Sequence, residues 1–83
     1  MITKDTAQEK LKEILIKPGD QFRHYKAEGT YEIVTLAVKE DTLEPLVVYR
    51  SLGHGGTTWV RTYENWSEEI EVEGTKKARF TRL

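Results

Sequence analysis

The spacing of the hydrophobic residues changes after Gly19. Before this residue, apolar side chains recur every three or four positions, which is the period of one face of a helix. This stripe consists of Ala7, Leu11, Ile14 and Leu15. The pattern predicts a helix over residues 3–16. Because so short a helix is marginal alone in water, we expect the rest of the chain or a second copy to cover its stripe.

Signals for both ends of this helix are present in the sequence. Thr6 followed by Glu9 has the spelling of a capping box, which is typical of a helix N-terminus. Lys17-Pro18-Gly19 ends the helical pattern, because proline cannot continue a helix. The length predicts a single domain, which we divide into an N-terminal helix, residues 1–17, and a small β-barrel domain, residues 18–83.

Beyond Gly19 the apolar residues alternate with polar ones, which is the pattern of β-strands. Four strands are predicted, at residues 21–26, 31–38, 46–52 and 57–63. Turns are expected at Glu28-Gly29 and at Gly53-His54-Gly55-Gly56, since glycine favours tight turns. Residues 64–68 suit a single helical turn. Short strands separated by tight turns predict a mainly β protein, α+β when the helix is included.

The last twenty residues separate their charges by sign. Residues 64–73 contain five glutamates and no cation, whereas residues 74–83 contain four cations and no acid. We interpret residues 69–73 and 78–83 as a closing hairpin around Gly74-Thr75 in which opposite charges pair across the strands. The predicted fold is a small SH3-like β-barrel of about five or six strands behind an N-terminal α-helix. A barrel of the OB type is the alternative.

Strand alternation also predicts which side chains share a face. In the fourth strand, Val60 is the expected core residue, which places Trp59 and Arg61 together on the opposite face. In the first strand Phe22 and His24 share one face, and Arg23 and Tyr25 share the other. The second strand is apolar on both faces and therefore needs a cover, for which the N-terminal helix is available.

Composition excludes several classes of protein. The formal net charge is −1, with 13 Lys and Arg against 14 Asp and Glu, which is not the strongly basic balance of a dedicated duplex-binding protein. The chain has no cysteine, which rules out disulfides and thiolate metal sites. No segment approaches the ~20 apolar residues of a membrane span, and no signal-peptide pattern is present. We expect a cytoplasmic protein without membrane contact.

No motif for a cofactor, a metal or a catalytic centre is recognisable. The two histidines lie thirty positions apart without an obvious third ligand. Gly53-His54-Gly55-Gly56 is not followed by the Lys-Ser/Thr of a phosphate-binding loop. We predict no cofactor and no metal. An acid–base pair of His24 with Glu44 is the weakest of the hypotheses, because their spacing does not support it.

Arginine repeatedly stands beside a large aromatic residue. Arg23 neighbours Tyr25, Arg50 follows Tyr49, and Arg61 lies two positions after Trp59. Arginine binds phosphate and carboxylate groups through a planar fork and also stacks on rings, and aromatic residues beside cations form platforms for single strands. The candidate binding residues are Arg23, His24, Tyr25, Tyr49, Arg50, Trp59 and Arg61. Arg50 follows an apolar register, so it is expected at a rim or in an internal ion pair.

Four segments give the sequence a family resemblance. They are P-G-D-Q-F-R-H-Y-K at 18–26, T-L-E-P-L-V-V-Y-R at 42–50, W-V-R at 59–61 and R-F at 79–80. Together they resemble the bacterial domain-of-unknown-function family numbered sixteen fifty-three, over residues 17–83. The resemblance implies a small stand-alone bacterial protein and supports the motif residues as site candidates. It implies no activity, because the family has none assigned.

Three hypotheses follow for the function. The first is a non-enzymatic binding module for an anionic or flat ligand: single-stranded nucleic acid, a nucleotide or an acidic peptide. The second is a structural or regulatory protein that associates with a protein partner or as a homodimer, through the helix stripe or a sheet edge. The third, a small enzyme that uses His24 and Glu44, has no substrate to suggest it.

Overall fold

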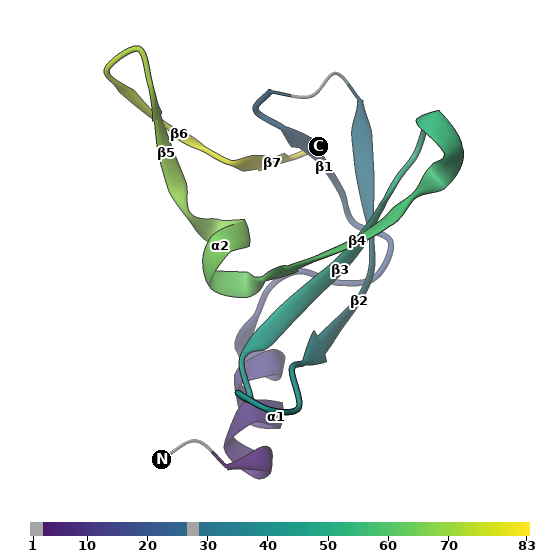
Figure 1. Ribbon diagram of the computed structural model, residues 1–83, viewed down its shortest axis with the longest axis vertical. Helices are drawn as coiled ribbons and strands as arrows, with labels where there is room; N and C mark the ends of the chain where they lie inside the picture. Colours follow the sequence, from purple (N-terminus) through teal and green to yellow (C-terminus); the bar gives the residue numbers. More distant parts are fainter. Residues whose placement is uncertain (1–2, 27–28) are drawn as a thin grey trace.

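Seven strands, an N-terminal helix and a helical turn make up most of the described chain, which is residues 3–26 and 29–83 of the computed structural model (Figure 1). The elements are α1 (Lys4–Glu13), β1 (Gln21–His24), β2 (Thr30–Val38), β3 (Pro45–Ser51), the 3-10 turn η1 (His54–Gly56), β4 (Thr58–Thr62), α2 (Tyr63–Ser67), β5 (Glu69–Val72), β6 (Thr75–Ala78) and β7 (Phe80–Arg82). The predicted mainly β, α+β class is confirmed. The predicted turn at residue 28 lies outside the described residues.

Five strands form one antiparallel sheet in the order β4-β3-β2-β1-β7. Strands β5 and β6 form a separate two-stranded ribbon, which projects away from the sheet in Figure 1. Within the described ranges, β4 and β7 are the two edges of the sheet and do not pair with each other, so no closed barrel forms. The predicted SH3-like barrel is therefore not confirmed. The chain after α2 builds the ribbon first, and β7 then returns to β1 and not to β4.

The closing hairpin pairs different residues from those predicted. Residues 69–72 pair with residues 75–78 around Gly74, and residues 80–82 leave the ribbon for the main sheet. Between the acidic and the basic segment, the structure shows the ion pair of Glu68 with Arg79 at 3.6 Å. Glu71 stands opposite Lys76 in the ribbon register. The segregation of charge did locate a hairpin, but its second strand is β6.

A β-bulge in β2 decides which of its apolar side chains are buried. The pairing of β2 with β3 shifts between Ile33 and Thr35, which leaves Val34 as an extra residue. Val34 is consequently exposed, whereas Ile33 is fully buried and Leu36 packs against the same core. Strict alternation placed Ile33 and Leu36 on opposite faces. The extra residue puts them on the same face.

The core lies on the face of the sheet that α2 covers. Its buried members are Ile16, Phe22, Ile33, Val47, Tyr49, Trp66 and Phe80. Val60, the core residue predicted for the fourth strand, is 58% exposed. The reason is the register: Val60 stands opposite Val48 on the outer face, while Trp59 and Arg61 stand opposite the buried Tyr49 and Val47.

Helix α1 ends earlier than the hydrophobic stripe predicts. Its N-cap is Thr3, whose hydroxyl accepts a hydrogen bond from the backbone N–H of Thr6, so the predicted cap at Thr6 is wrong by three residues. Ala7 is buried, and the helix contacts β2 and β3. Because residue 14 is already extended, Leu15 is 80% exposed and Ile16 takes its place in the core at 8%. None of the described helices is long and apolar enough to cross a membrane.

Candidate ligand-binding pocket

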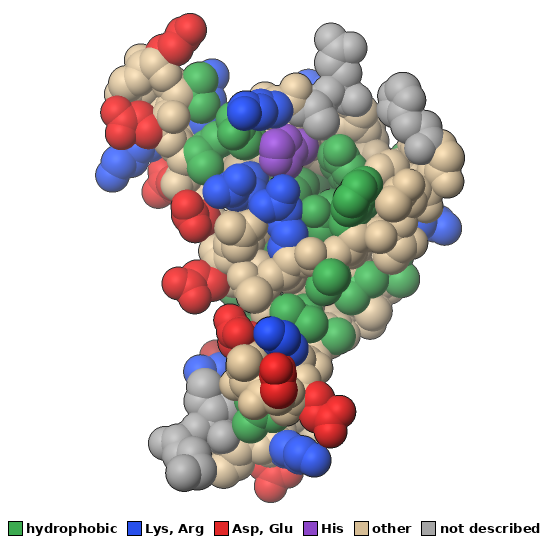
Figure 2. Space-filling model, in the orientation of Figure 1, with side chains coloured by type: hydrophobic (Ala, Val, Ile, Leu, Met, Phe, Trp, Pro, Cys, Tyr) green, Lys and Arg blue, Asp and Glu red, His purple; other side chains and the backbone are tan. Residues whose placement is uncertain are grey.

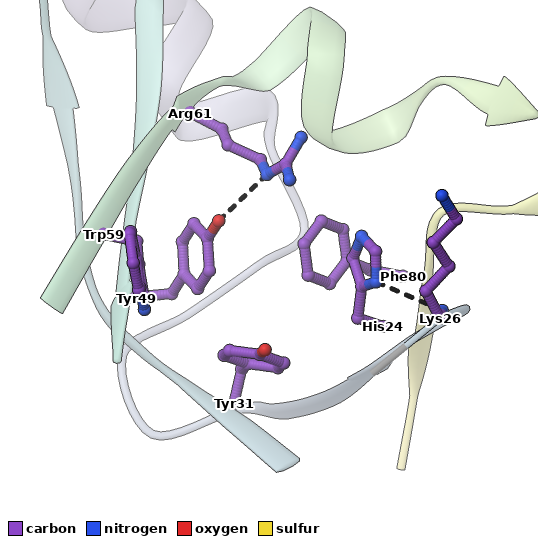
Figure 3. A pocket seen from close by; sticks show the side chains of 7 residues that line it. All are labelled: His24, Lys26, Tyr31, Tyr49, Trp59, Arg61 and Phe80. Carbon is purple, nitrogen blue, oxygen red and sulfur yellow. Dashed lines mark hydrogen bonds between the residues drawn. The ribbon is translucent and has the colours of Figure 1, made fainter. Parts of the chain in front are cut away.

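An open pocket of about 310 Å³ lies beside the aromatic core, where β1, β2, β3, β4 and β7 come together (Figure 3). Seven residues line it: His24, Lys26, Tyr31, Tyr49, Trp59, Arg61 and Phe80. They come from segments spread over almost sixty positions of sequence. The walls are mainly aromatic, and the polar groups belong to the two cations, the imidazole and the two tyrosine hydroxyls.

The wall behind the pocket is a packed aromatic cluster. Phe80 stacks on Trp66, with ring centroids 3.7 Å apart and planes 8° from parallel. Tyr49 meets the rings of both residues edge-on, at 5.6 Å from Phe80 and 4.9 Å from Trp66. Tyr31 adds a further edge-on contact to Tyr49 at 5.6 Å. Such interlocked rings leave little freedom, so the pocket has a rigid wall before any ligand arrives.

Arg61 is held in place by neutral groups. Its Nε donates a 2.9 Å hydrogen bond to the Tyr49 hydroxyl, and its Nη1 donates to the side-chain oxygen of Asn65. The guanidinium carbon lies 5.4 Å from the centre of the Phe80 ring. Arg61 forms no ion pair within residues 3–26 and 29–83. The pocket therefore contains an oriented cation whose charge is not matched by a carboxylate of the residues that the structure describes.

Trp59 forms the opposite wall from His24 in Figure 3. Its indole Nε1 donates a 3.3 Å hydrogen bond to the Ser51 hydroxyl, which fixes the plane of the ring. Half of the side chain is exposed. Unlike the other pocket rings, it forms no stacked or edge-on ring pair with a described aromatic side chain. A flat ligand would find this indole face accessible for stacking.

The surroundings of His24 in the folded protein favour its neutral form over its charged form. Burial lowers the pKa of its imidazole, and the positive charges of Arg61, Arg79 and Lys26 lower it further. Its Nδ1 accepts a 3.2 Å hydrogen bond from the backbone N–H of Lys26. The proton of the neutral ring must then lie on Nε2, which can act as a hydrogen-bond donor.

Positively charged side chains gather around the pocket although the formal net charge of the chain is −1. Three cations act on His24, and among the described residues only Arg79 of the three forms an ion pair, with Glu68 at 3.6 Å. Arg79 also donates through its Nε to the backbone oxygen of Asn65. Figure 2 shows basic side chains gathered around the histidine next to a hydrophobic area. A local excess of this kind attracts anions even when the net charge is −1.

The structure brings four of the seven predicted site residues together and separates the other three. His24, Tyr49, Trp59 and Arg61 line the pocket. Arg50 lies on the outer face, where its Nη2 is 2.6 Å from a carboxylate oxygen of Glu32. Arg23 is exposed on that same side of β1, and Tyr25 packs its ring beside His24, 4.7 Å away, without lining the pocket.

Four residues of the site were not among the sequence candidates. Tyr31 and Phe80 line the pocket from β2 and β7, Lys26 lies at its rim, and Asn65 orients two arginines from α2. The R-F segment at residues 79–80 was a usable signal for Phe80. Nothing in the sequence pattern distinguished Asn65, because its role depends on the placement of α2 beside β4.

The structure gives no support to a metal or acid–base site. Across the described part of the chain, no three His, Asp or Glu side chains gather as metal ligands would. Glu44 belongs to the loop before β3, at the end of the strand away from Tyr49 and Ser51. It does not line the pocket that contains His24.

The fold and the pocket define a small, mainly β protein with an open aromatic cavity and a cationic rim. The chain belongs to DUF1653, a family described as proteins of unknown function, whose pattern it matches over residues 20–82. It is similar to a crystal structure of a DUF1653 protein from Bordetella bronchiseptica, with 30% sequence identity, a TM-score of 0.68, and coverage of 83% of this chain and 88% of the other. No curated protein matches it. The family that the four segments predicted is thus confirmed.

Proposed function

We propose that this protein is a binding module whose pocket takes one compact ligand carrying a flat ring and an anionic group, as a nucleotide does. The arrangement of Arg61 is the observation that supports this most. A guanidinium fixed by the Tyr49 hydroxyl and Asn65, and without an acid partner in the described chain, is prepared for a phosphate or carboxylate. The exposed face of Trp59 supplies a stacking surface for the ring.

The size of the pocket favours a single ligand unit over a long single strand. Its volume of about 310 Å³ is at the lower end of the range for small-molecule sites. Platforms for single strands combine successive stacking rings with a basic groove that follows the backbone. Here Arg50 is paired with Glu32 on the outer face, so the cations do not form such a track. An acidic peptide lacks the flat ring that would use Trp59.

The pocket supports a catalytic function less well than a binding function. His24 is poised as a neutral donor, and its Nδ1 is already engaged by the Lys26 backbone. A general base needs a free lone pair within reach of its substrate and usually a partner that orients the ring. Binding of an anion beside Arg61 needs neither a free lone pair nor a partner that orients the imidazole, because an anion is bound by charge and geometry alone.

The direct test is an amide NMR titration of isotope-labelled protein at low salt. The probes are a set of mononucleotides, a short mixed-sequence single-stranded DNA, the corresponding RNA and an acidic peptide. We expect mononucleotides to shift the signals of residues 24–26, 49, 59–61 and 80, and added salt to weaken the effect. An unchanged spectrum with every probe would contradict the proposal.

Three alanine variants locate the site. Trp59→Ala and Arg61→Ala should each lower the affinity by about 10-fold or more. Stacking of a base on an aromatic ring contributes ~1–3 kcal/mol, and a hydrogen bond to a charged group contributes ~1.5–3 kcal/mol. Arg50→Ala is the matched control, because it removes an arginine from the neighbouring strand on the other face. Equal weakening by Arg50→Ala would show that the measured binding is general attraction to positive charge.

A further inference from the structure

Strand β4 is an edge of the main sheet, and half of its backbone groups point away from the sheet. The N–H of Ser51 donates to the carbonyl oxygen of Thr57 at 3.0 Å, so these two residues form a hydrogen-bonded pair. Such pairs alternate along an antiparallel ladder. Trp59 and Arg61 therefore direct their backbone groups towards β3, and Thr58, Val60 and Thr62 direct theirs outward.

Among the described residues, the outward edge of β4 has few of the features that normally prevent strands from pairing. Proteins protect exposed edges with charged side chains, proline or a covering element. The residues whose backbone groups point outward are two threonines and a valine, and the segment contains no proline. Val60 is 58% exposed at the centre of the strand. The other edge, β7, is only three residues long.

The sequence of β4, T-W-V-R-T, is complementary to itself when a second copy runs antiparallel. With Val60 opposite the partner's Val60, each threonine faces a threonine and Trp59 faces the partner's Arg61. The pairs at Val60 and at the threonines are then the hydrogen-bonded ones. Trp59 and the partner's Arg61 form a non-hydrogen-bonded pair, in which side chains approach most closely and an arginine packs well on an indole.

We propose that two copies of this chain associate through β4, antiparallel and with Val60 on the two-fold axis. This register overlaps all five residues of the strand. The neighbouring registers that keep the same backbone groups facing each other are reached by sliding one strand along the other by two residues. In these registers either Trp59 or Arg61 lies opposite its own copy, and the overlap is shorter. The arginine register would oppose like charges. A second copy is the occupant because the strand supplies its own complement.

The pairing joins the two pockets. Trp59 and Arg61 point to the pocket face in both copies, so each pocket gains the partner's Arg61 beside the indole wall. The dimer does not depend on the proposed ligand, since it is held by backbone hydrogen bonds and side chains of β4. Its small interface predicts weak association, observable between micromolar and millimolar concentration.

The test measures the mass of the particle by sedimentation equilibrium as concentration is raised. The wild type should rise from the 9.6 kDa of one chain towards twice that mass. Val60→Lys and Val60→Glu should each stay at the mass of one chain, because each places two like charges opposite one another. An equimolar mixture of the two variants should regain the double mass. This rescue requires residue 60 to face residue 60.

Two further measurements show whether the edge of β4 itself is responsible for the dimer. Val34→Lys introduces the same charge at another exposed valine, away from the edge, and should dimerise like the wild type. In the wild type, the amide protons of Thr58 and Val60 should exchange more slowly at high concentration, while those of Trp59 and Arg61 change little. A wild type that stays at one chain mass at millimolar concentration, or a dimer unaffected by Val60→Lys, would overturn the proposal.

Discussion

The Nε of Arg61 donates a hydrogen bond of 2.9 Å to the hydroxyl of Tyr49, which connects the rim of the pocket to its aromatic wall. Neighbouring strands β3 and β4 supply the two residues, but the two do not stand directly opposite each other, since Arg61 faces Val47. The long arginine side chain therefore leans along the strand to reach the tyrosine. This diagonal contact fixes the direction in which the guanidinium presents its remaining donors.

Tyr49→Phe tests this contact. The substitution keeps the ring in the core and removes the acceptor of the Arg61 hydrogen bond, so we expect unfolding to become easier by about 1–2 kcal/mol. Loss of orientation should also weaken binding of the mononucleotide that gives the largest shifts, by about 3–10-fold. Urea denaturation and the NMR titration measure the two effects. Tyr31→Phe is the control for stability, because its hydroxyl makes no hydrogen bond to any described residue. An equal loss of stability in Tyr31→Phe would mean that the effect of Tyr49→Phe does not come from its contact with Arg61.

The two tryptophans should contribute very differently to stability. Trp66 is 4% exposed and stacked on Phe80, whereas Trp59 is 50% exposed at the pocket. Trp66→Ala should therefore lower the free energy of unfolding by ~3–5 kcal/mol, enough to unfold much of so small a protein. Trp59→Ala should lower it by less than about 1.5 kcal/mol. Comparable losses in urea denaturation would mean that Trp59 belongs to the core and not to a binding surface.

Stability should fall in mildly acidic solution because of His24. Its pKa is lower in the folded protein than in the unfolded chain, where it is about 6.5. The unfolded chain therefore binds the proton first, and the contribution of neutral His24, present above pH ~6.5, is lost as the pH falls towards the folded pKa.

The urea midpoint of the wild type should decrease between pH 7.5 and pH 5.5 by more than that of His24→Gln. Asp20, whose pKa is also lowered, chiefly by its hydrogen bond from Arg82, titrates below this range and does not contribute to the difference. Parallel pH profiles of the wild type and the variant would show that His24 has the same pKa in the folded protein as in the unfolded chain.

The end of α1 offers a comparison of two adjacent residues. Ile16→Ala should destabilise the fold by ~2–4 kcal/mol, because Ile16 packs in the core with Phe22 and Trp66. Leu15→Ala should change stability by about 0.5 kcal/mol or less, since its side chain is almost fully exposed. Thermal unfolding of the two variants decides the matter. A larger loss of stability in Leu15→Ala than in Ile16→Ala would mean that Leu15 is buried, as the helical stripe in the sequence predicts.

Much of the local structure follows from short-range rules. The helix with its Ala7 contact, the four strands, the turn at residues 53–56 and the helical turn before the ribbon are each specified within a few residues, by periodicity, glycine and proline. The family follows from the segments themselves. The grouping of Trp59 with Arg61 also follows, because residues two positions apart on a strand without a bulge share a face.

The sequence by itself determined these elements and, outside the bulge of β2, which side chains of a strand share a face, because such relations depend only on the period of a helix or a strand. Only the tertiary structure decided which face is buried. Val60 faces solvent because Trp59 is paired with Tyr49, Val34 is left out by a bulge, and Arg50 lies opposite Glu32. These outcomes depend on register between strands, and register is set by contacts between residues far apart in the chain. The pocket arises in the same way, when β7 returns to β1 and places Phe80 beside Tyr49 and Arg61.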